Sequence, residues 1–465
     1  SLYLLLATSL LCGCASLDAR PSFNEVKHAV EGCTGYTVKW NQNTAQDEAV
    51  RKEVRRLLEE PLRVDEAVQI ALLNNRRLQA VYERLGIAQA DLFQAGLLKN
   101  PVFDAELRFL EGSPSGKDPI LEMSVTQGFM QAFMIPLRKR LARARLEEAK
   151  AEVTGSILEL AARVKVAFFS LQGLEQSLDL ERGILHAAEA SHEVALRLRK
   201  AGNITSLDLA GRRALYEQSK LDVASAETAV AEARERMNAL MGLWGEDTQW
   251  KAVPRLPQVP EESMDMTDLE RRAVASSRDL SILREQMRAE AALAGIETTE
   301  LVFPELEAGA ASEREPDSSW NVGPALAVAL PIFDWGQARR AEGRARLRRF
   351  WNDYTALAIE LRAAVRTARD RVINARRQSD YYRRVVVPLA EQISLETQLQ
   401  YNAMQLGVFH LLQAKRREME ARRGYIVSLR DYWIARTELE QILAGRLGRS
   451  PATMTSSPSD PQMQA

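Results

Sequence analysis

The sequence of 465 residues has few of the side chains on which most catalytic and metal sites depend, with three cysteines and four histidines. Cys12 and Cys14 end an apolar run and Cys33 stands alone, so there is neither a disulfide framework nor a Cys-x-x-Cys pair. His186 and His192 are six residues apart, a spacing that does not place them on one helix face. Ser-His-Asp sets, His-Glu-x-x-His and phosphate-binding glycine loops do not stand out either. We predict no catalytic residues, no metal and no cofactor, and we expect that the protein is not an enzyme.

The chain also lacks an excess of either charge. Its 62 Lys and Arg residues balance 63 Asp and Glu residues, which gives a net charge of −1. Nucleic-acid binding depends on a basic field that this balance does not provide, so we expect no nucleic acid as a partner. Aromatic residues make up only 6% of the chain while charged residues make up 27%, a composition typical of long helices with interlaced charges.

The N-terminus carries the pattern of a targeting signal. The apolar run Leu2–Leu11 is too short to cross a bilayer as a helix and is followed by Cys12-Gly13-Cys14. A small residue followed by Cys at this place resembles a bacterial lipobox, which implies cleavage and lipid attachment at Cys14. Residues 1–13 are then a partial signal peptide, and Ala15 in place of Asp favours the outer membrane. The alternative is a simple signal peptide with two accidental cysteines.

The rest of the chain repeats one pattern about 200 residues apart. Arg143-Ala144-Arg145-Leu146 returns as Arg344-Ala345-Arg346-Leu347, and Leu240-Met241-Gly242 returns as Leu443-Ala444-Gly445. Solenoid units are only about 20–50 residues long, so the pattern indicates a duplicated half-domain. The predicted parts are a lipidated, extended N-terminal arm (14–60), repeat 1 (61–247), a Pro-rich linker (248–264), repeat 2 (265–448) and a disordered tail (449–465).

Each repeat is predicted to hold a helix, a β-hairpin, a very long helix and a return helix. The strands are indicated by strict alternation, for example over 103–109, where every odd residue is apolar and every even residue polar. The hairpins are expected at about 102–128 and about 305–331. The helices are expected over 62–98, 138–200, 207–241, 269–301, 338–406 with a kink at Pro388, and 411–447.

The two-faced strands are the feature that most constrains function. Two hairpins give four strands, whereas a barrel closes with about eight. In water the apolar faces would need a cover, but strands of about 9–11 residues cross a bilayer with apolar side chains toward lipid and polar ones toward a wet lumen. Closure must then come from several copies of the chain.

The chain resembles the TolC family of outer-membrane efflux channels over nearly its whole mature length. The matching segments are 65–75, 94–101, 329–336 and 401–415. The resemblance implies a mainly α fold with a small transmembrane β portion, in which a homotrimer closes a twelve-stranded β-barrel and a periplasmic α-barrel of long coiled helices. Together with the lipobox-like segment, it implies a lipid-anchored protein in the outer membrane of a Gram-negative bacterium. There it would be the passive exit duct of a tripartite efflux system, together with a periplasmic adaptor protein and an inner-membrane pump of the resistance–nodulation–division type.

The resemblance further implies which residues act. The turns that dock the adaptor map to two helix tips, Gly202, Asn203 and Ile204 in repeat 1 and Gly407, Val408 and Phe409 in repeat 2. Glycine suits such turns because it tolerates positive φ. Many family members carry an acidic ring past the second tip, but here 410–413 holds no carboxylate. Asp208 and Gln413 are therefore the candidates for lining the aperture.

One alternative of a different class is a lipid-anchored periplasmic coiled-coil scaffold or adaptor protein. The long charged helices allow either interpretation. The alternating strands favour the channel, because a periplasmic scaffold has no reason to present an apolar strand face to water. The cargo is not identified by the sequence, although the segment 401–415 is closer to heavy-metal and general efflux systems than to protein secretion.

Overall fold

The structure is a computed structural model that describes residues 17–42, 45–108, 120–128, 130–262, 264–302, 306–314, 319–328 and 335–448. Its contacts divide the chain into two compact units. Unit 1 is drawn from 1–26, 82–153 and 279–358, and unit 2 from 27–81, 154–278 and 359–465. The predicted signal peptide and lipid-attachment site (1–16), part of the predicted strand-to-helix junction (329–334) and the predicted tail (449–465) lie outside the described residues.

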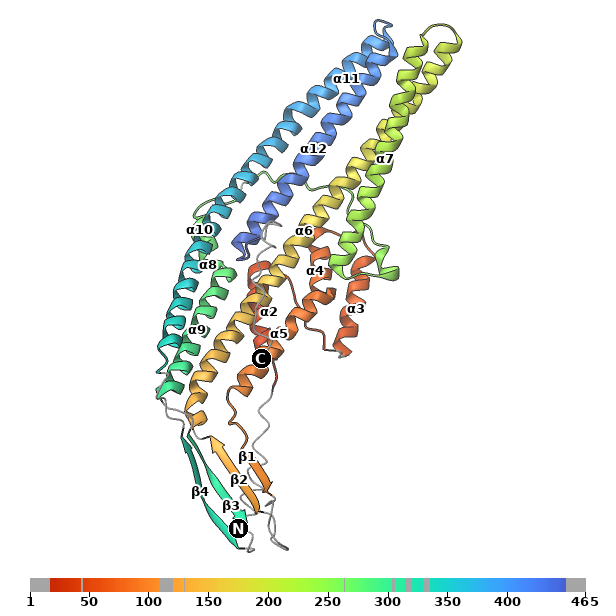
Figure 1. Cartoon of the computed structure of the whole chain (residues 1–465). Coiled ribbons are helices and arrows are strands. Elements are labelled where there is room, and N and C mark those ends of the chain that lie inside the picture. Colours follow the sequence, from red (N-terminus) through yellow and green to blue (C-terminus); the bar gives the residue numbers. More distant parts are fainter. Residues whose placement is uncertain are drawn as a thin grey trace. The chain divides into compact units, whose positions relative to one another are not determined.

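Unit 1 contains a four-stranded antiparallel sheet in the order β1-β2-β3-β4 (Figure 1). The strands are β1 (Val102–Arg108), β2 (Ile120–Gly128), β3 (Leu306–Arg314) and β4 (Trp320–Val328). Both predicted hairpins are present. Strands β2 and β3, from different repeats, also pair with each other, from Leu121 opposite Arg314 to Gly128 opposite Glu307.

The register of the sheet gives it one apolar and one polar face, because side chains alternate along each strand. On the apolar face Phe103 lies opposite Val125, which lies opposite Ala310. The described residues leave this face largely uncovered: Phe103 is 63% exposed, and Val322 and Leu326 on β4 are 76% and 69% exposed.

The polar face carries a row of carboxylates. Glu106 lies opposite Glu122, which lies opposite Glu313. Like charges directly opposite each other destabilise a sheet, and Arg108 offsets the repulsion by donating to Glu106 at 3.0 Å and to Glu122 at 2.6 Å.

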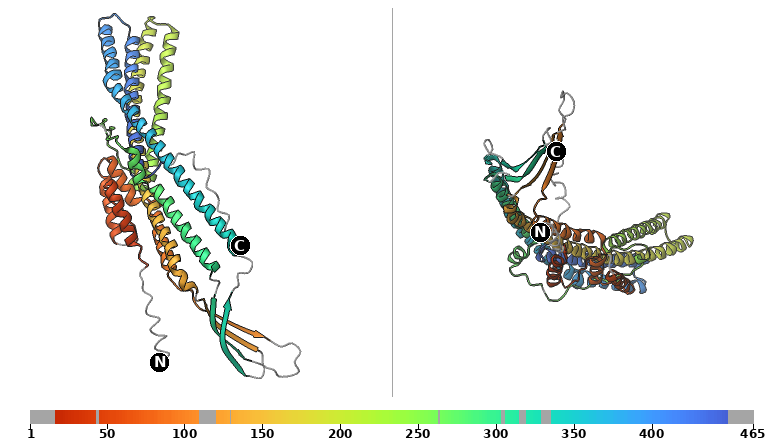
Figure 2. Two further views of the ribbon diagram at one scale, coloured as in Figure 1. Left: turned by 90° about the vertical axis from the view of Figure 1, so that its left-hand side faces the viewer. Right: turned by 90° about the horizontal axis from the view of Figure 1, so that it is seen from below.

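Unit 1 also contains helices. It includes most of α5 (Arg76–Gln94) and α9 (Arg278–Val302), and the first parts of α6 (Met130–Lys200) and α10 (Gln337–Tyr381). Figure 2 shows α9 alongside the first part of α10. Gln286 on α9 donates to Glu148 on α6 at 2.7 Å. Helix α6 begins at Met130, before the predicted start at 138, and contains Pro136.

Unit 2 is helical, and its helices include most of α2 (Arg20–Thr34), α3 (Ala45–Leu58), α4 (Val64–Asn74), α7 (Ser206–Met241), α8 (Leu269–Ser276), α11 (Val387–Asn402) and α12 (Val408–Leu443). The prediction of an extended arm before residue 60 was wrong, because α2 and α3 lie there. Both helices have an apolar stripe, but most of their residues are polar. In a single sequence such a pattern is only weak evidence for a helix. Among the described residues, no helix combines the length and the apolar character needed to cross a bilayer.

Three predicted helices are interrupted. The helix expected over 62–98 breaks at Asn75, which is 7% exposed. Its amide Nδ2 donates to Leu240 O at 2.8 Å and its Oδ1 accepts from Leu78 N at 3.0 Å, so it caps the next helix. The helix expected over 269–301 breaks at Ser277. The helix expected over 338–406 is interrupted by a π-helical stretch, Tyr382–Val386, directly before α11, while the kink expected at Pro388 stays a prediction.

The same close backbone approach occurs in both repeats, where the return helix ends. Gly242 has φ of +69° and Gly445 has φ of +108°. Beside them, Asn74 Nδ2 donates to Gly242 O at 2.8 Å, and Arg278 N donates to Gly445 O at 2.8 Å. Each return helix is thus fixed to the break between the first two helices of its own repeat.

Candidate functional site

The tip between α6 and α7 is a helix-ending turn with glycine at its centre. Gly202 has φ of +78°, as expected. Its N–H donates to Arg199 O at 3.0 Å, and the N–H of Asn203 donates to Leu198 O at 2.9 Å. These two bonds are the Schellman pattern, in which a left-handed residue lets the chain leave the helix while the last carbonyls stay bonded. Ile204 is half-buried, and its carbonyl accepts from Arg199 at 3.1 Å.

Asp208 stabilises the start of α7. The Thr205 hydroxyl and its N–H donate to the Asp208 carboxylate at 2.7 and 3.1 Å, and Asp208 N donates back to the hydroxyl at 3.1 Å. This is a capping box. The hydrogen bond from the Thr205 side chain, followed by that from its backbone, holds the pKa of Asp208 below its ordinary value. The carboxylate is exposed but already bonded within its own turn.

The second tip, between α11 and α12, uses the same turn with a different residue. Met404 has φ of +59°; its N–H donates to Tyr401 O at 3.0 Å, and Gln405 N donates to Gln400 O at 2.9 Å. Gly407 has φ of −75° and is the N-cap of α12. The expectation that Gly407 supplies the positive φ was therefore wrong. Gly407 occupies the place of Thr205, and Met404 that of Gly202.

Met404 is a functional candidate that the sequence analysis missed. Left-handed backbone costs a residue with a side chain about 1–2 kcal/mol, and the Met404 side chain is 95% exposed, so burial does not offset the strain. Methionine is not a turn signal. Alignment of the repeats at Ala201 and Ala403 would have found it, because each of these residues directly precedes the left-handed position.

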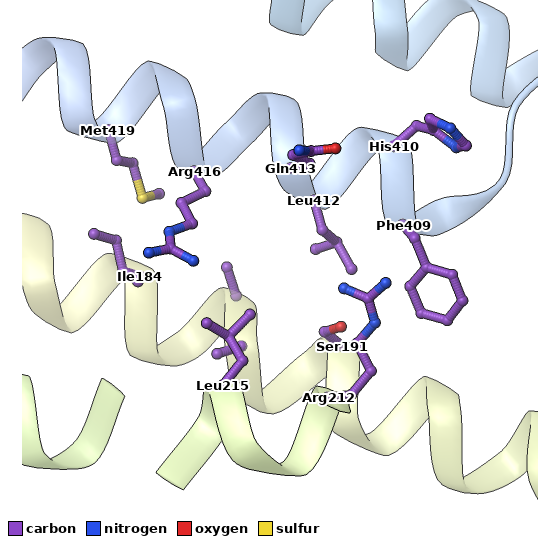
Figure 3. A pocket seen from close by; sticks show the side chains of 12 residues that line it. Ile184, Ser191, Arg212, Leu215, Phe409, His410, Leu412, Gln413, Arg416 and Met419 are labelled. Atoms are coloured by element: carbon purple, nitrogen blue, oxygen red, sulfur yellow. The ribbon is translucent and has the colours of Figure 1, made fainter. Parts of the chain in front are cut away.

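The two tips lie at the same end of unit 2 (Figures 1 and 2). Phe409, in the first turn of α12, does not project freely: the Arg212 guanidinium of α7 lies 3.7 Å from its ring centroid. Phe409 and Gln413 line a cavity of about 360 Å³ between α6, α7 and α12 (Figure 3). Val408 begins α12 beside them.

Comparison with known proteins shows which sequence family and which relatives this chain is similar to. A sequence model of the family described as "Outer membrane efflux protein" matches residues 67–243. The chain is 23% identical over 389 residues to the cobalt-zinc-cadmium resistance protein CzcC of Cupriavidus metallidurans, covering 82% of this chain and 90% of CzcC. Residues 67–243 thus carry the sequence pattern of outer membrane efflux proteins, and the similarity to CzcC extends over most of the chain.

Solved structures of outer membrane channels have the same fold as this chain. The MtrE outer membrane channel of Neisseria gonorrhoeae, in its open state, matches with a TM-score of 0.69 at 19% identity over 83% of this chain and 89% of that chain. The outer membrane protein VceC of Vibrio cholerae matches with a TM-score of 0.65 at 15% identity over 83% of this chain and 97% of that chain. The family resemblance and the fold class predicted from the sequence are confirmed.

Proposed function

We propose that this efflux protein is the outer-membrane channel subunit of a tripartite efflux system and acts as a passive exit duct. The observation that carries the proposal is the two-faced sheet of unit 1. Its apolar face leaves Phe103, Val322 and Leu326 mostly exposed, while its polar face carries Glu106, Glu122 and Glu313. This arrangement suits strands that contact lipid on one side and a wet lumen on the other.

The proposed assembly is a homotrimer. Each described edge strand, β1 and β4, has a paired neighbour on one side only, and four strands are about half of what a closed barrel needs. Three copies of the sheet would give the twelve strands expected for the family. Pairing β4 of one copy with β1 of the next would also remove the open edges, which otherwise promote aggregation.

The proposed docking sites for the periplasmic adaptor are the two tips, with Gly202, Asn203 and Ile204 on one and Val408 and the newly recognised Met404 on the other. Met404 is apolar, exposed and held in a strained backbone conformation. Residues of this kind are found where a protein binds a partner. An inner-membrane pump, of the resistance–nodulation–division type in our proposal, would deliver cargo through the adaptor.

Three further parts of the proposal concern anchoring, the aperture and cargo. Lipid on Cys14 would tether the chain to the outer membrane. Gln413 and Asp208 remain candidates for the aperture, although the carboxylate of Asp208 is already used in the capping box. The similarity to CzcC makes divalent metal ions the first cargo to test.

The experiment that tests the proposal uses the full chain and a Cys14→Ser variant that cannot be lipidated. Both should need detergent for extraction, run as trimers by multi-angle light scattering and conduct ions in planar bilayers. A Cys14→Ser protein that dissolves as a monomer in plain buffer would refute the channel and revive the scaffold alternative. Metal tolerance of a deletion strain complemented with the gene, beside its pump and adaptor, then tests the cargo.

A further inference from the structure

The cavity beside the second tip is built from three helices of unit 2. It measures about 360 Å³, within the range of about 300–1,000 Å³ of pockets that hold small molecules. Its apolar wall comes from all three helices and includes Ile184, Leu215, Leu412 and Met419. The remaining lining residues are Ala187, Ala188, Ser191, Arg212, Phe409, His410, Gln413 and Arg416.

The charge of the lining has one sign. None of the lining residues is acidic, while Arg212 and Arg416 are basic. Arg416 is engaged by Glu420 at 3.0 Å. Arg212 rests on the Phe409 ring and points toward α12 in Figure 3. Burial lowers the pKa of Arg212, and this effect outweighs the opposing influence of Asp208. A partly desolvated guanidinium of this kind is a good partner for an incoming anion.

The cavity wall also contains a buried polar group, the hydroxyl of Ser191. Ser191 on α6 is 2% exposed, and within the described part of the chain its Oγ has no hydrogen-bond partner. Neighbouring serines of these helices bond back to a carbonyl four residues earlier, as Ser219 does with Leu215 at 2.9 Å. Buried hydroxyls are normally bonded, so an unpaired one in a cavity wall indicates a ligand or water position.

We propose that this cavity binds a small organic anion, an aryl or alkyl carboxylate, with its carboxylate on Arg212 and Ser191 Oγ and its apolar body against Ile184, Leu412 and Met419. Such a ligand would contact α6, α7 and α12 at once. It would therefore tie the helices of the first tip to the return helix of the second. The inference does not rest on the proposed efflux function, because binding is measured on the purified protein alone.

The test is ¹⁹F NMR on the full-length protein in detergent micelles, with 4-(trifluoromethyl)benzoate as the probe. The isosteric 4-(trifluoromethyl)benzamide and 4-(trifluoromethyl)benzylamine, and empty micelles, are the controls. We expect saturable broadening of the benzoate signal, with binding at least tenfold weaker for the amide and absent for the amine.

Variants then locate the site. Arg212→Gln should weaken benzoate binding at least tenfold, whereas Arg213→Gln, next to it on α7 but outside the cavity lining, should leave it unchanged. Ala187→Leu fills the cavity without changing charge and should abolish binding, which covers the case in which Arg212→Gln does not fold. Absence of saturable binding to the wild type, equal binding of the amine, or unchanged binding in folded Arg212→Gln or Ala187→Leu protein would overturn the proposal.

Discussion

The glycines at the ends of the two return helices are predicted to differ in how strongly they resist a side chain. A Cβ at Gly445 would lie 2.3 Å from Ser276 O, and φ there is +108°. A Cβ at Gly242 would lie 2.8 Å from Asn74 O, and φ there is +69°. In the interior of α7, a Cβ at Gly211 would meet no atom of the described residues within 4 Å, apart from the backbone of its own helix and its chain neighbours. The three Gly→Ala variants therefore form a graded series with an internal control.

The magnitudes follow from these contacts. Left-handed backbone alone costs alanine about 1–2 kcal/mol. At Gly445 the added methyl group must also displace the carbonyl of Ser276. We expect this shift to break the neighbouring hydrogen bond from Arg278 N to Gly445 O. Buried groups left unpaired in this way cost about 1–3 kcal/mol. We expect about 2–5 kcal/mol of destabilisation for Gly445→Ala and about 1–2 kcal/mol for Gly242→Ala. Gly211→Ala should instead stabilise by about 0.5–1 kcal/mol, because glycine is a poor helix former.

The assay is thermal loss of helical circular dichroism in detergent, at one scan rate for all proteins. A change of about 1 kcal/mol moves the midpoint by about 2–4 °C in domains of 150–250 residues, so the midpoint of Gly445→Ala should fall by at least about 4 °C. The order of the midpoints is the decisive result. If Gly445→Ala melts with the wild type or above Gly211→Ala, the close approach at the repeat ends is not as described.

Further predictions concern the tips and the sheet. Met404→Gly should keep or raise the melting temperature, since it relieves positive φ, yet lower efflux if the adaptor contacts that side chain; complementation of a deletion strain measures the second effect. Gly407→Ser should be tolerated or slightly stabilising by the same melt, because φ is −75° and serine is a good N-cap. Asp208→Asn should lower the melting temperature at neutral pH, because the hydrogen bonds from Thr205 favour the ionised carboxylate and lower its pKa. The difference should shrink as the pH falls below about 4, the ordinary pKa of Asp, and vanish below the depressed pKa of the folded protein. Leu326→Arg should abolish the heat-resistant trimer band on gels, because an arginine that faces lipid costs about 2–4 kcal/mol at the bilayer midplane. The control variant Asn321→Arg places the charge on the polar face of the same strand and should still form trimers.

The positions of the elements were largely predictable because local patterns specify them. Alternation of apolar and polar residues specified the hairpins, and the first tip followed from Gly202, whose freedom at positive φ is a property of glycine itself. The breaks at Asn75 and Ser277 were not predictable. Asn75 stops a helix by bonding to Leu240 O, a partner 165 residues away that no local pattern indicates.

The sequence by itself determined the period of each segment, the duplication and the family, because these depend on neighbours along the chain. Tertiary structure alone decided the pairing of β2 with β3, which joins the two repeats into one sheet. It also decided that Met404 and not Gly407 takes the left-handed turn, and that Arg212 covers Phe409. The physical reason is the same in each case. These features depend on which distant groups come into contact, and the local pattern of apolar and polar residues does not specify those contacts.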